Sequence, residues 1–343
     1  MELQFLGTSA GTPTKSRNVS GLAVKKAQSK LWVLVDCGEA TQHRLLHTAL
    51  SLHHLQAICI THVHGDHCYG LPGLLASASL QGRTATLIII GPRELQEWLS
   101  VTMQLTQVTL SYALDYIDVA TLTEPVPLQE MSVSAWPLSH RVPCFGFQFT
   151  EADSPYRLNK EKLLAEGIPS GPTWGQLQRG EIAILRDGRR LDSADYLLAN
   201  RPARKVVVAG DNDLPALLRE AVRSAQVLVH EATYTQDIAD KIGAAQALAD
   251  SVSNQPNVDP QHSSAKLIAE FAHAVALPNL ILTHFSPRYS GGAKGRSMNE
   301  LEQEALSYYS GTLFLARDLA RYYLDTSGVL RKVPMDNTKP NRL

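Results

Sequence analysis

The sequence predicts an α/β protein that consists of one large layered domain and an inserted segment. Two observations predict this class. First, short apolar runs typical of buried strands alternate along the chain with helical stretches, which is the pattern of a layered α/β fold. Second, residues 151–204 interrupt this alternation, which resumes at Lys205. The 343 residues are enough for one such domain with an insertion, or for two domains.

The expected elements follow one another through the chain. An alternating strand at residues 2–6 is closed by a glycine-rich turn at 7–11. Further strands are expected at residues 21–25, 31–35, 57–60, 86–90, 112–119, 132–138, 145–150, 205–209, 225–229 and 280–282. Helices are expected at residues 41–50, 71–80, 93–105, 214–223 and 264–275, the last with Ser263 or Ser264 as its N-cap. Residues 246–261 are expected to form a loop, and the polar tail at 331–343 to be flexible.

The inserted segment at residues 151–204 differs in its sequence pattern from the rest of the chain. Pro155, Pro169, Gly171, Pro172 and Gly175 interrupt it, and its basic residues are nearly balanced by acidic ones. We expect a surface excursion with some structure of its own. It is too long for an ordinary connection, and insertions of this length tend to be functional.

The composition is typical of an ordinary globular protein. Hydrophobic residues make up 44% of the chain and the mean hydropathy is -0.12, so a sizeable core is expected and no run reaches the length of a membrane span. The first residues lack the basic and apolar regions of a signal peptide. Four scattered cysteines, at 37, 59, 68 and 144, form no disulfide framework, which favours a cytoplasmic location. A net charge of -1 gives no general attraction to nucleic acid.

The clearest chemical signal is a cluster of ligand-type residues that directly follows the apolar run 57–60. His62, His64, Asp66 and His67 lie within six positions. Imidazole and carboxylate together suit zinc and related metals, and packing alone gives no reason to concentrate them. His62 and His64 can point the same way on extended backbone, whereas Asp66 and His67 project toward a second point. This spacing favours two metal ions over one.

Polar residues also terminate other strand-like runs. In layered α/β proteins ligands gather outside strand ends, so these positions are expected to converge. The runs end in Thr61-His62, Ser139-His140, Gly210-Asp211, His230-Glu231 and Thr283-His284. We expect one metal to take His62, His64 and His140 and the other to take Asp66, His67 and His284. Asp211 is the natural bridge, because a carboxylate offers two oxygens to two cations.

Such a pair of ions suits phosphoryl chemistry. Metals about 3.5–4 Å apart can share a hydroxide and stabilise both the attacking and the leaving oxygen. Asp66 would ligate a metal and also accept the proton of the water. His262, ahead of an expected helix, can donate a proton to the leaving oxygen. The alternative for His262 is a simple surface histidine. His230 and Glu231 are expected to orient the metal ligands.

The H-x-H-x-D-H run resembles the signature of the metallo-β-lactamase superfamily. The wider combination of motifs resembles the ribonuclease Z family of tRNA 3′-processing endonucleases, whose short bacterial form is also called ribonuclease BN. The matching features are Phe5-Leu6-Gly7-Thr8-Ser9-Ala10-Gly11 with Pro13 and Arg17-Asn18; Asp36-Cys37-Gly38-Glu39; the histidine run with Gly70-Leu71-Pro72-Gly73-Leu74; Gly171-Pro172 with Leu177 and Gly180; Gly210-Asp211; His230-Glu231-Ala232-Thr233; His262-Ser263-Ser264; and Thr283-His284 with Ser286, Arg288 and Tyr289.

The resemblance implies a four-layer αβ/βα sandwich of the metallo-β-lactamase type with a protruding arm. It divides the chain into one catalytic domain at 1–150 and 205–330, a tRNA-binding arm at 151–204 and the tail. It implies a homodimer with two Zn²⁺ ions per chain, for which Mn²⁺ or Co²⁺ are possible substitutes. The implied reaction is hydrolytic removal of the 3′ trailer of precursor tRNA by a metal-bridging hydroxide, which leaves a 3′-hydroxyl on the tRNA. Asp66, His262 and Glu231 would be catalytic, and RNA contacts are expected at Lys15, Arg17, Asn18, Gly171, Pro172 and Arg288.

The chain departs from the family pattern at a few places. Asn212 replaces the usual threonine and Gln261 the usual glycine, the stretch between Glu231 and His262 is longer than usual, and the tail is extended. Three alternatives stay open: a 3′ exoribonuclease, a small-molecule phosphodiesterase, or a non-catalytic RNA-binding protein with a relic metal site. The sequence does not decide between endonucleolytic and exonucleolytic cleavage, how CCA ends are handled, which tRNAs are preferred or which metal is used.

Overall fold

The computed structural model describes residues 1–152, 157–198, 202–252, 261–290 and 295–334. It divides the chain into two compact units. The core unit comprises Met1–Thr150 and Arg204–Leu343, and the arm unit comprises Glu151–Ala203. These limits lie within one residue of the expected insertion at 151–204.

The first sheet of the core unit has eight strands in the order β19-β18-β1-β2-β3-β4-β5-β6. The strands from β3 to β6 run parallel, and the others pair antiparallel. The strands are β1 (Glu2–Gly7), β2 (Gly21–Lys25), β3 (Trp32–Val35), β4 (Leu55–Cys59), β5 (Leu87–Gly91), β6 (Leu114–Asp118), β18 (Arg321–Leu324) and β19 (Leu330–Val333).

The second sheet has seven strands in the order β17-β16-β15-β14-β9-β8-β7. The strands from β14 to β17 run parallel, and β9 is antiparallel to β14. The strands are β7 (Val126–Pro127), β8 (Met131–Leu138), β9 (Cys144–Glu151), β14 (Lys205–Val208), β15 (Val227–Glu231), β16 (Asn279–Thr283) and β17 (Thr312–Leu315).

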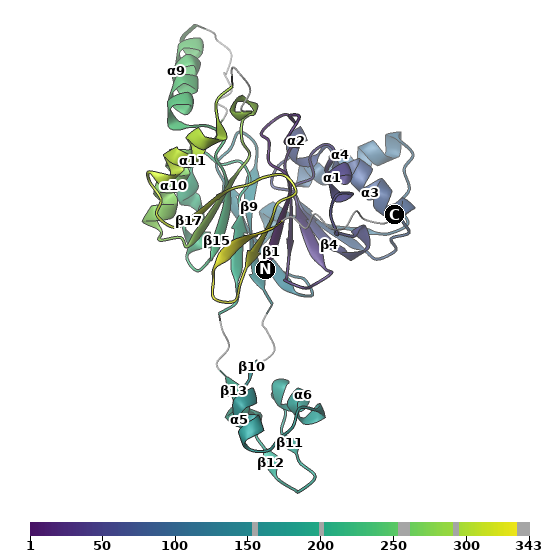
Figure 1. Cartoon of the computed structure of the whole chain (residues 1–343). Coiled ribbons are helices and arrows are strands. Elements are labelled where there is room, and N and C mark those ends of the chain that lie inside the picture. The colour runs from purple at the N-terminus through teal and green to yellow at the C-terminus, as the bar shows by residue number, and fades with distance from the viewer. Residues whose placement is uncertain (153–156, 199–201, 253–260, 291–294, 335–343) are drawn as a thin grey trace. The chain divides into compact units, whose positions relative to one another are not determined.

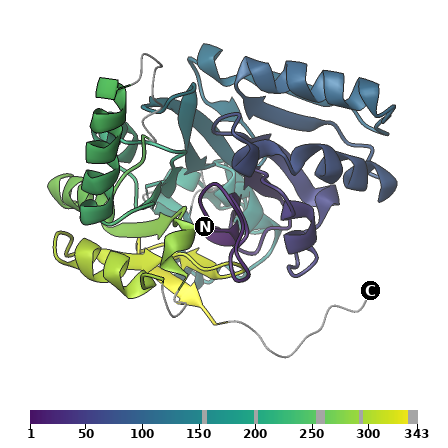
Figure 2. The ribbon, with the colours of Figure 1, turned by 90° about the horizontal axis from the view of Figure 1, so that it is seen from above.

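Helices cover the outer face of each sheet (Figures 1 and 2). On the first sheet these are α1 (Thr41–Leu45), α2 (Gly65–Cys68), α3 (Leu71–Leu80) and α4 (Arg93–Leu105), with the 3₁₀ turns η1 (Leu52–His54) and η2 (Val119–Thr121) nearby in the chain. On the second sheet side lie η3 (Pro215–Leu218), α8 (Arg219–Val222), α9 (Gln236–Val252), α10 (Ala265–Ala274), η4 (Pro287–Tyr289) and α11 (Met298–Leu306).

Alternating strand residues build the layers. In β4, Ala57 belongs to the core between the sheets, and its neighbour Ile58 packs in the cluster that contains the α3 and α4 residues. In β14, Val206 and Val208 belong to the core between the sheets, whereas Val207 packs with the α10 cluster. This two-residue period is that of strands buried on both faces. The result is the expected αβ/βα sandwich.

The arm unit has a small apolar core of its own. It contains α5 (Lys160–Ala165), α6 (Pro172–Gln178), α7 (Ser193–Tyr196) and two strand pairs, β10 (Arg157–Leu158) with β13 (Leu197–Leu198) and β11 (Ala183–Ile184) with β12 (Arg190–Leu191). Leu163 and Leu177 are fully buried in this core.

Several expected elements are corrected by the structure. The helix expected at 41–50 ends at Leu45, and the one expected at 214–223 is split into η3 and α8. The loop expected at 246–261 is wrong for its first part, because α9 continues to Val252; residues 253–260 lie outside the described residues. The tail begins as strand β19, which pairs with β18, so residues 331–333 are ordered; residues 335–343 lie outside the described residues.

Within the described part of the chain, every helix is too short or too polar to cross a lipid bilayer.

Candidate metal centre

The carboxyl ends of several strands bring the expected ligand residues to one edge of the sandwich. β4 leads into His62, β14 into Asp211 and β16 into His284. β8 and β9 are neighbours joined by a short loop, and β9 is antiparallel to β14, so β8 ends at the same edge and delivers His140. All seven residues expected as metal ligands therefore converge, and they form two groups of ligand atoms that share Asp211.

The first group contains three imidazoles and one carboxylate oxygen. His64 Nδ1 lies 2.9 Å from His62 Nε2 and 3.3 Å from His140 Nε2. Asp211 Oδ2 lies 3.7 Å from His62 Nε2 and 3.8 Å from His140 Nε2. These four atoms can surround a single cation.

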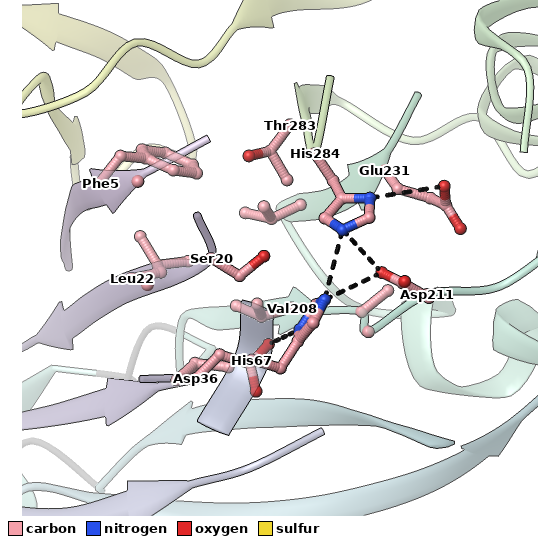
Figure 3. Close-up of a pocket in the computed structure, with 16 residues that line it drawn as sticks. Phe5, Ser20, Leu22, Asp36, His67, Val208, Asp211, Glu231, Thr283 and His284 are labelled. Atoms are coloured by element: carbon pink, nitrogen blue, oxygen red, sulfur yellow. Dashed lines mark hydrogen bonds and ion pairs between the residues drawn. The ribbon is translucent and has the colours of Figure 1, made fainter. Parts of the chain in front are cut away.

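The second group lies on the other oxygen of Asp211. His67 Nε2 is 3.3 Å from His284 Nε2, and Asp66 Oδ2 is 3.4 Å and 3.3 Å from these two atoms. Asp211 Oδ1 completes the group at 3.5 Å from His67 Nε2 and 3.4 Å from His284 Nε2. Figure 3 shows His67, His284 and Asp211 pointing toward one another. Asp211 therefore turns one oxygen to each group, as a bridging ligand would.

The spacing fits metal coordination. A tetrahedral cation about 2.0–2.1 Å from each ligand requires ligand atoms about 3.3–3.4 Å apart. Five of the six distances between the ligand atoms of the second group lie between 3.3 and 3.5 Å. The first group matches less closely, with edges from 2.9 to 3.8 Å. Both groups have the nitrogen and oxygen donors that Zn²⁺ accepts.

Electrostatics also favours cations here. Three carboxylates, from Asp36, Asp66 and Asp211, lie within 3.5 Å of the ring nitrogens of His67. Burial alone would lower the pKa of His67, but these carboxylates raise it well above its ordinary range. Burial would raise the pKa of Asp211, but His284 and His67 hold it well below its ordinary range. The buried site thus attracts positive charge, as a pair of divalent cations would supply.

Four of the rings are anchored by Nδ1 and direct Nε2 into the site. His67 Nδ1 donates to Asp36 at 2.7 Å, and His140 Nδ1 donates to the Gln261 carbonyl at 3.1 Å. His62 Nδ1 lies 3.0 Å from the Thr61 hydroxyl, and His284 Nδ1 lies 3.1 Å from the Thr233 hydroxyl. Such contacts fix the orientation and tautomer of metal-binding histidines. His64 is reversed: its Nδ1 faces the group, and its Nε2 accepts from Arg141 Nε at 3.1 Å.

Asp36 was not assigned a role from the sequence. It is buried at the end of β3, where it also accepts from the backbone N–H and the hydroxyl of Thr61 at 2.8 and 3.0 Å. It has a left-handed backbone with φ 58, which costs energy in a non-glycine residue and is typical of strained functional sites. The signal that identified the other residues, a carboxylate directly after an apolar strand, also applies to Asp36.

His262 and Glu231 form a second arrangement beside the candidate metal ligands. His262 Nδ1 donates to Glu231 Oε2 at 2.9 Å and lies 3.7 Å from Asp211 Oδ2. Burial would lower the pKa of His262, but Glu231 and Asp211 raise it to about 9. Glu231 is fully buried and also accepts from the hydroxyl of Thr233 and the backbone N–H of Asn212. These two carboxylates therefore favour the protonated form of the His262 ring.

Asn212 and Gln261, two departures from the family pattern, both support this arrangement. The Asn212 amide lies 3.1 Å from His230 Nε2, and its oxygen accepts from the Ser139 N–H at 3.2 Å. Its carbonyl accepts from Ser263 Oγ at 2.6 Å. Asn212 therefore links the segments that carry His140 and His262. Gln261 has a left-handed φ of 47, the conformation that glycine adopts without strain.

The residues expected to contact RNA divide into two classes. Lys15 and Arg288 are exposed on the core unit, and Gly171 and Pro172 are exposed on the arm unit. Arg17 and Asn18 are buried instead. The Arg17 guanidinium donates to the Tyr289 and Ser286 carbonyls at 3.0 and 3.1 Å, and Asn18 donates to the Glu39 carbonyl at 2.8 Å. The Nη1 and Nη2 atoms of Arg17 and the Asn18 amide are thus bonded to carbonyls of the protein itself, so both residues hold its loops together.

Solved structures share this architecture over nearly the whole chain. Human short-form tRNase Z has a TM-score of 0.60 at 24% identity and covers 94% of this chain and 98% of its own. A metallo-β-lactamase fold protein from Bacillus subtilis also has a TM-score of 0.60, at 16% identity over 93% of this chain and 98% of its own. The fold and the two groups of ligands define a protein of the metallo-β-lactamase fold.

Sequence comparison identifies the family within this fold class. The family model of the anti-Pycsar protein Apyc1 matches residues 1–154. Ribonuclease Z of Marinobacter nauticus is 49% identical over 334 residues, which cover 97% of this chain and 99% of the relative. Ribonuclease Z of Pseudomonas putida is 48% identical over 97% of this chain and 100% of the relative. The chain belongs to the ribonuclease Z family.

Proposed function

We propose that this protein is a metal-dependent endoribonuclease that removes the 3′ trailer from precursor tRNA and leaves a 3′-hydroxyl on the tRNA. The observation that carries the proposal is the complete set of seven ligand-type residues around Asp211, in a chain whose full-length relatives are named ribonuclease Z. A relic site would lack one or more of these ligands.

Two Zn²⁺ ions per chain are proposed, with Mn²⁺ or Co²⁺ as substitutes. His62, His64 and His140 would hold one ion, Asp66, His67 and His284 the other, and Asp211 both. When bound, such a pair activates water at neutral pH and stabilises negative charge on the phosphate.

The protein residues supply proton transfer at both ends of the reaction. A water molecule attacks the phosphorus atom, and Asp66 accepts its proton. The bond between phosphorus and the 3′-oxygen of the tRNA breaks, and His262 donates a proton to that oxygen. The products are a tRNA with a 3′-hydroxyl and a trailer with a 5′-phosphate. Glu231 keeps His262 protonated and oriented through the bond of 2.9 Å.

The arm unit is proposed to bind the body of the tRNA. Arg186 and Arg190 are exposed on the β11–β12 hairpin and have no carboxylate within ion-pair distance among the described residues. Gly171 and Pro172 begin α6 on the surface of the same unit. Lys15 and Arg288 would contact RNA phosphates near the metal centre. Such contacts position a nucleic acid and supply much of its affinity.

A homodimer in the cytoplasm is also proposed. Large apolar side chains are exposed on or beside the helices that cover the first sheet, where a second copy could bury them: Leu46, Tyr69, Leu80, Val101 and Leu105. All four cysteines are free and buried, which suits a reducing compartment.

Incubation with a 3′-extended tRNA precursor, with and without a chelator, tests the function. We expect a single cut at the trailer junction, a 3′-hydroxyl on the tRNA, an intact trailer and loss of cleavage on chelation. A ladder of successively shortened tRNAs would instead indicate a 3′ exoribonuclease. Binding without cleavage in the presence of added zinc would indicate a non-catalytic RNA-binding protein.

A further inference from the structure

A cavity of about 450 Å³ lies beside the metal centre and shares His262 and Gln261 with it. Residues from Gln236 to Ala244 of α9 form one part of its wall, and Tyr234 and Asp213 form another. Its volume is in the range of ordinary small-ligand sites, about 300–1,000 Å³. The cavity lies where this chain has the longer stretch between Glu231 and His262.

Tyr234 gives the cavity an aromatic surface close to the chemistry. Its ring centroid lies 6.2 Å from that of His262, and the two planes make an angle of 75°. The Arg288 guanidinium lies 5.8 Å from the centroid of the Tyr234 ring. The ring is half-buried. Aromatic rings and arginine planes beside one another are typical of surfaces that stack nucleobases.

Two carboxylates, those of Asp213 and Asp240, line the cavity beside the polar side chains of Gln236, Gln261, His262 and Ser264. The Asp213 side chain lines the cavity, and its carboxylate has no hydrogen-bond or ion-pair partner among the described residues. Asp240 also lines the cavity, and its Oδ1 accepts from the Gln236 side chain at 2.7 Å. A carboxylate without a partner can accept a hydrogen bond from a ligand, so a ligand group that donates to Asp213 is favoured. Two carboxylates repel phosphate, which points to an uncharged group with N–H donors.

The position of His262 indicates which part of the substrate reaches the cavity. If His262 protonates the departing 3′-oxygen, the nucleoside that carries this oxygen must lie against His262. The base of that nucleoside can then enter the space between Tyr234 and α9. This step rests on the proposed function.

We propose that the cavity is the subsite for the base of the last nucleotide retained on the tRNA. The base stacks on Tyr234, and its exocyclic amino group donates to Asp213. Adenine, cytosine and guanine carry such an amino group and uracil does not, so precursors that end in uridine at this position are the poorer substrates. Tyr234 and Asp213 are therefore specificity-determining residues.

The test compares four precursor tRNAs that differ only in this nucleotide. Cleavage is expressed relative to hydrolysis of bis(p-nitrophenyl) phosphate, which has no base. Wild-type protein should disfavour the uridine precursor in kcat/KM by roughly 2- to 10-fold, the effect of one hydrogen bond. The isosteric Asp213→Asn variant turns the acceptor into a possible donor and should remove or reverse this preference. Asp115→Asn, on the exposed end of β6, is the matched control.

Loss of stacking is tested with Tyr234→Leu. The Tyr234→Leu variant should have a KM roughly 5- to 150-fold above the wild-type KM for all four precursors. The Tyr234→Phe variant should keep the wild-type KM, because the aromatic ring is kept. Tyr308→Leu is the matched control, since Tyr308 is a partly exposed tyrosine with Lys266 5.1 Å from its ring centroid. A loss in Tyr234→Phe as large as in Tyr234→Leu would overturn the stacking role.

A binding measurement separates this proposal from the proposed function. Adenosine titrated into the wild-type protein should shift the NMR resonances of the Tyr234 ring more than uridine at equal concentration. If precursor tRNA is not cleaved but adenosine shifts the resonances of the Tyr234 ring, the proposed endoribonuclease function is wrong and the base subsite is supported. If all four precursors are cleaved equally and neither nucleoside shifts the resonances of the Tyr234 ring, the proposed base subsite is overturned. The proposed endoribonuclease function is then still supported, because the precursors are cleaved.

Discussion

Replacing His262 with alanine should lower the rate on RNA far more than the rate on a substrate with an activated leaving group. A nitrophenolate departs without a proton, whereas a ribose 3′-oxygen requires one. General-acid catalysis contributes about 10²–10⁴-fold, so we expect a loss of this size on precursor tRNA and only a small loss on bis(p-nitrophenyl) phosphate.

The structure also gives the pH dependence of this effect. A pKa of about 9 keeps roughly 99% of His262 protonated at pH 7, and the acid is lost as pH rises through 9. Glu231→Gln removes the charge that is the main cause of the raised pKa. If the pKa falls to its ordinary value of about 6.5, only about a quarter of the rings are protonated at pH 7. The rate on RNA should fall about fourfold there, and its alkaline limb should move to lower pH.

The assay measures kcat on both substrates from pH 6 to pH 10 for the wild type, His262→Ala and Glu231→Gln. His273→Ala is the matched control, because His273 is an exposed histidine of α10 that does not line the centre. Equal losses on both substrates in His262→Ala would refute the role of general acid and indicate a structural role.

Three further predictions concern Asp66, the arm unit and the dimer. Asp66→Ala should abolish turnover and reduce the metal content of the folded protein; near-normal activity with full metal content would show that Asp66 is neither ligand nor base. Replacing residues 157–198 with a short Gly/Ser linker should leave the melting temperature and bis(p-nitrophenyl) phosphate hydrolysis largely intact, because the apolar cluster of the arm unit is separate from the three clusters of the core unit. Affinity for precursor tRNA should fall, and unchanged affinity would exclude the arm as an RNA clamp. Leu105→Glu, at a side chain that is 78% exposed on α4, should shift a dimer toward monomer in light scattering at equal concentration, and an unaltered dimer would exclude this surface.

The convergence of the seven expected ligand residues could be predicted because the signals that mark them are local in the sequence. His62, His64, Asp66 and His67 are crowded behind one strand, and His140, Asp211 and His284 each end another. The residues that orient them act across long distances in the chain, as Asp36 does on His67, 31 residues away. Nothing in the local pattern of Asn212 or Gln261 reveals that they hold His230 and His140 in place.

Other features could not be predicted from the sequence, for physical reasons. Arg17 lies in a polar loop, which suggested an RNA contact, but its guanidinium is used by backbone carbonyls that are 269 and 272 residues away in the chain. α9 was taken for a loop in its last part because prolines and asparagines follow it. The strands β17, β18 and β19 have four residues each, too few for a period to stand out. Their places are set by pairing with β16, β1 and β18, respectively.

We expect Asp211 to join two cation sites, and metal titration measures both sites at once. Protein stripped with a chelator should bind two equivalents of Zn²⁺ per chain in calorimetry, and elemental analysis after dialysis should give the same number. Asp211→Ala should lose affinity at both sites, whereas His140→Ala should weaken one site and largely spare the other. A single equivalent that does not rise with added metal would contradict the account.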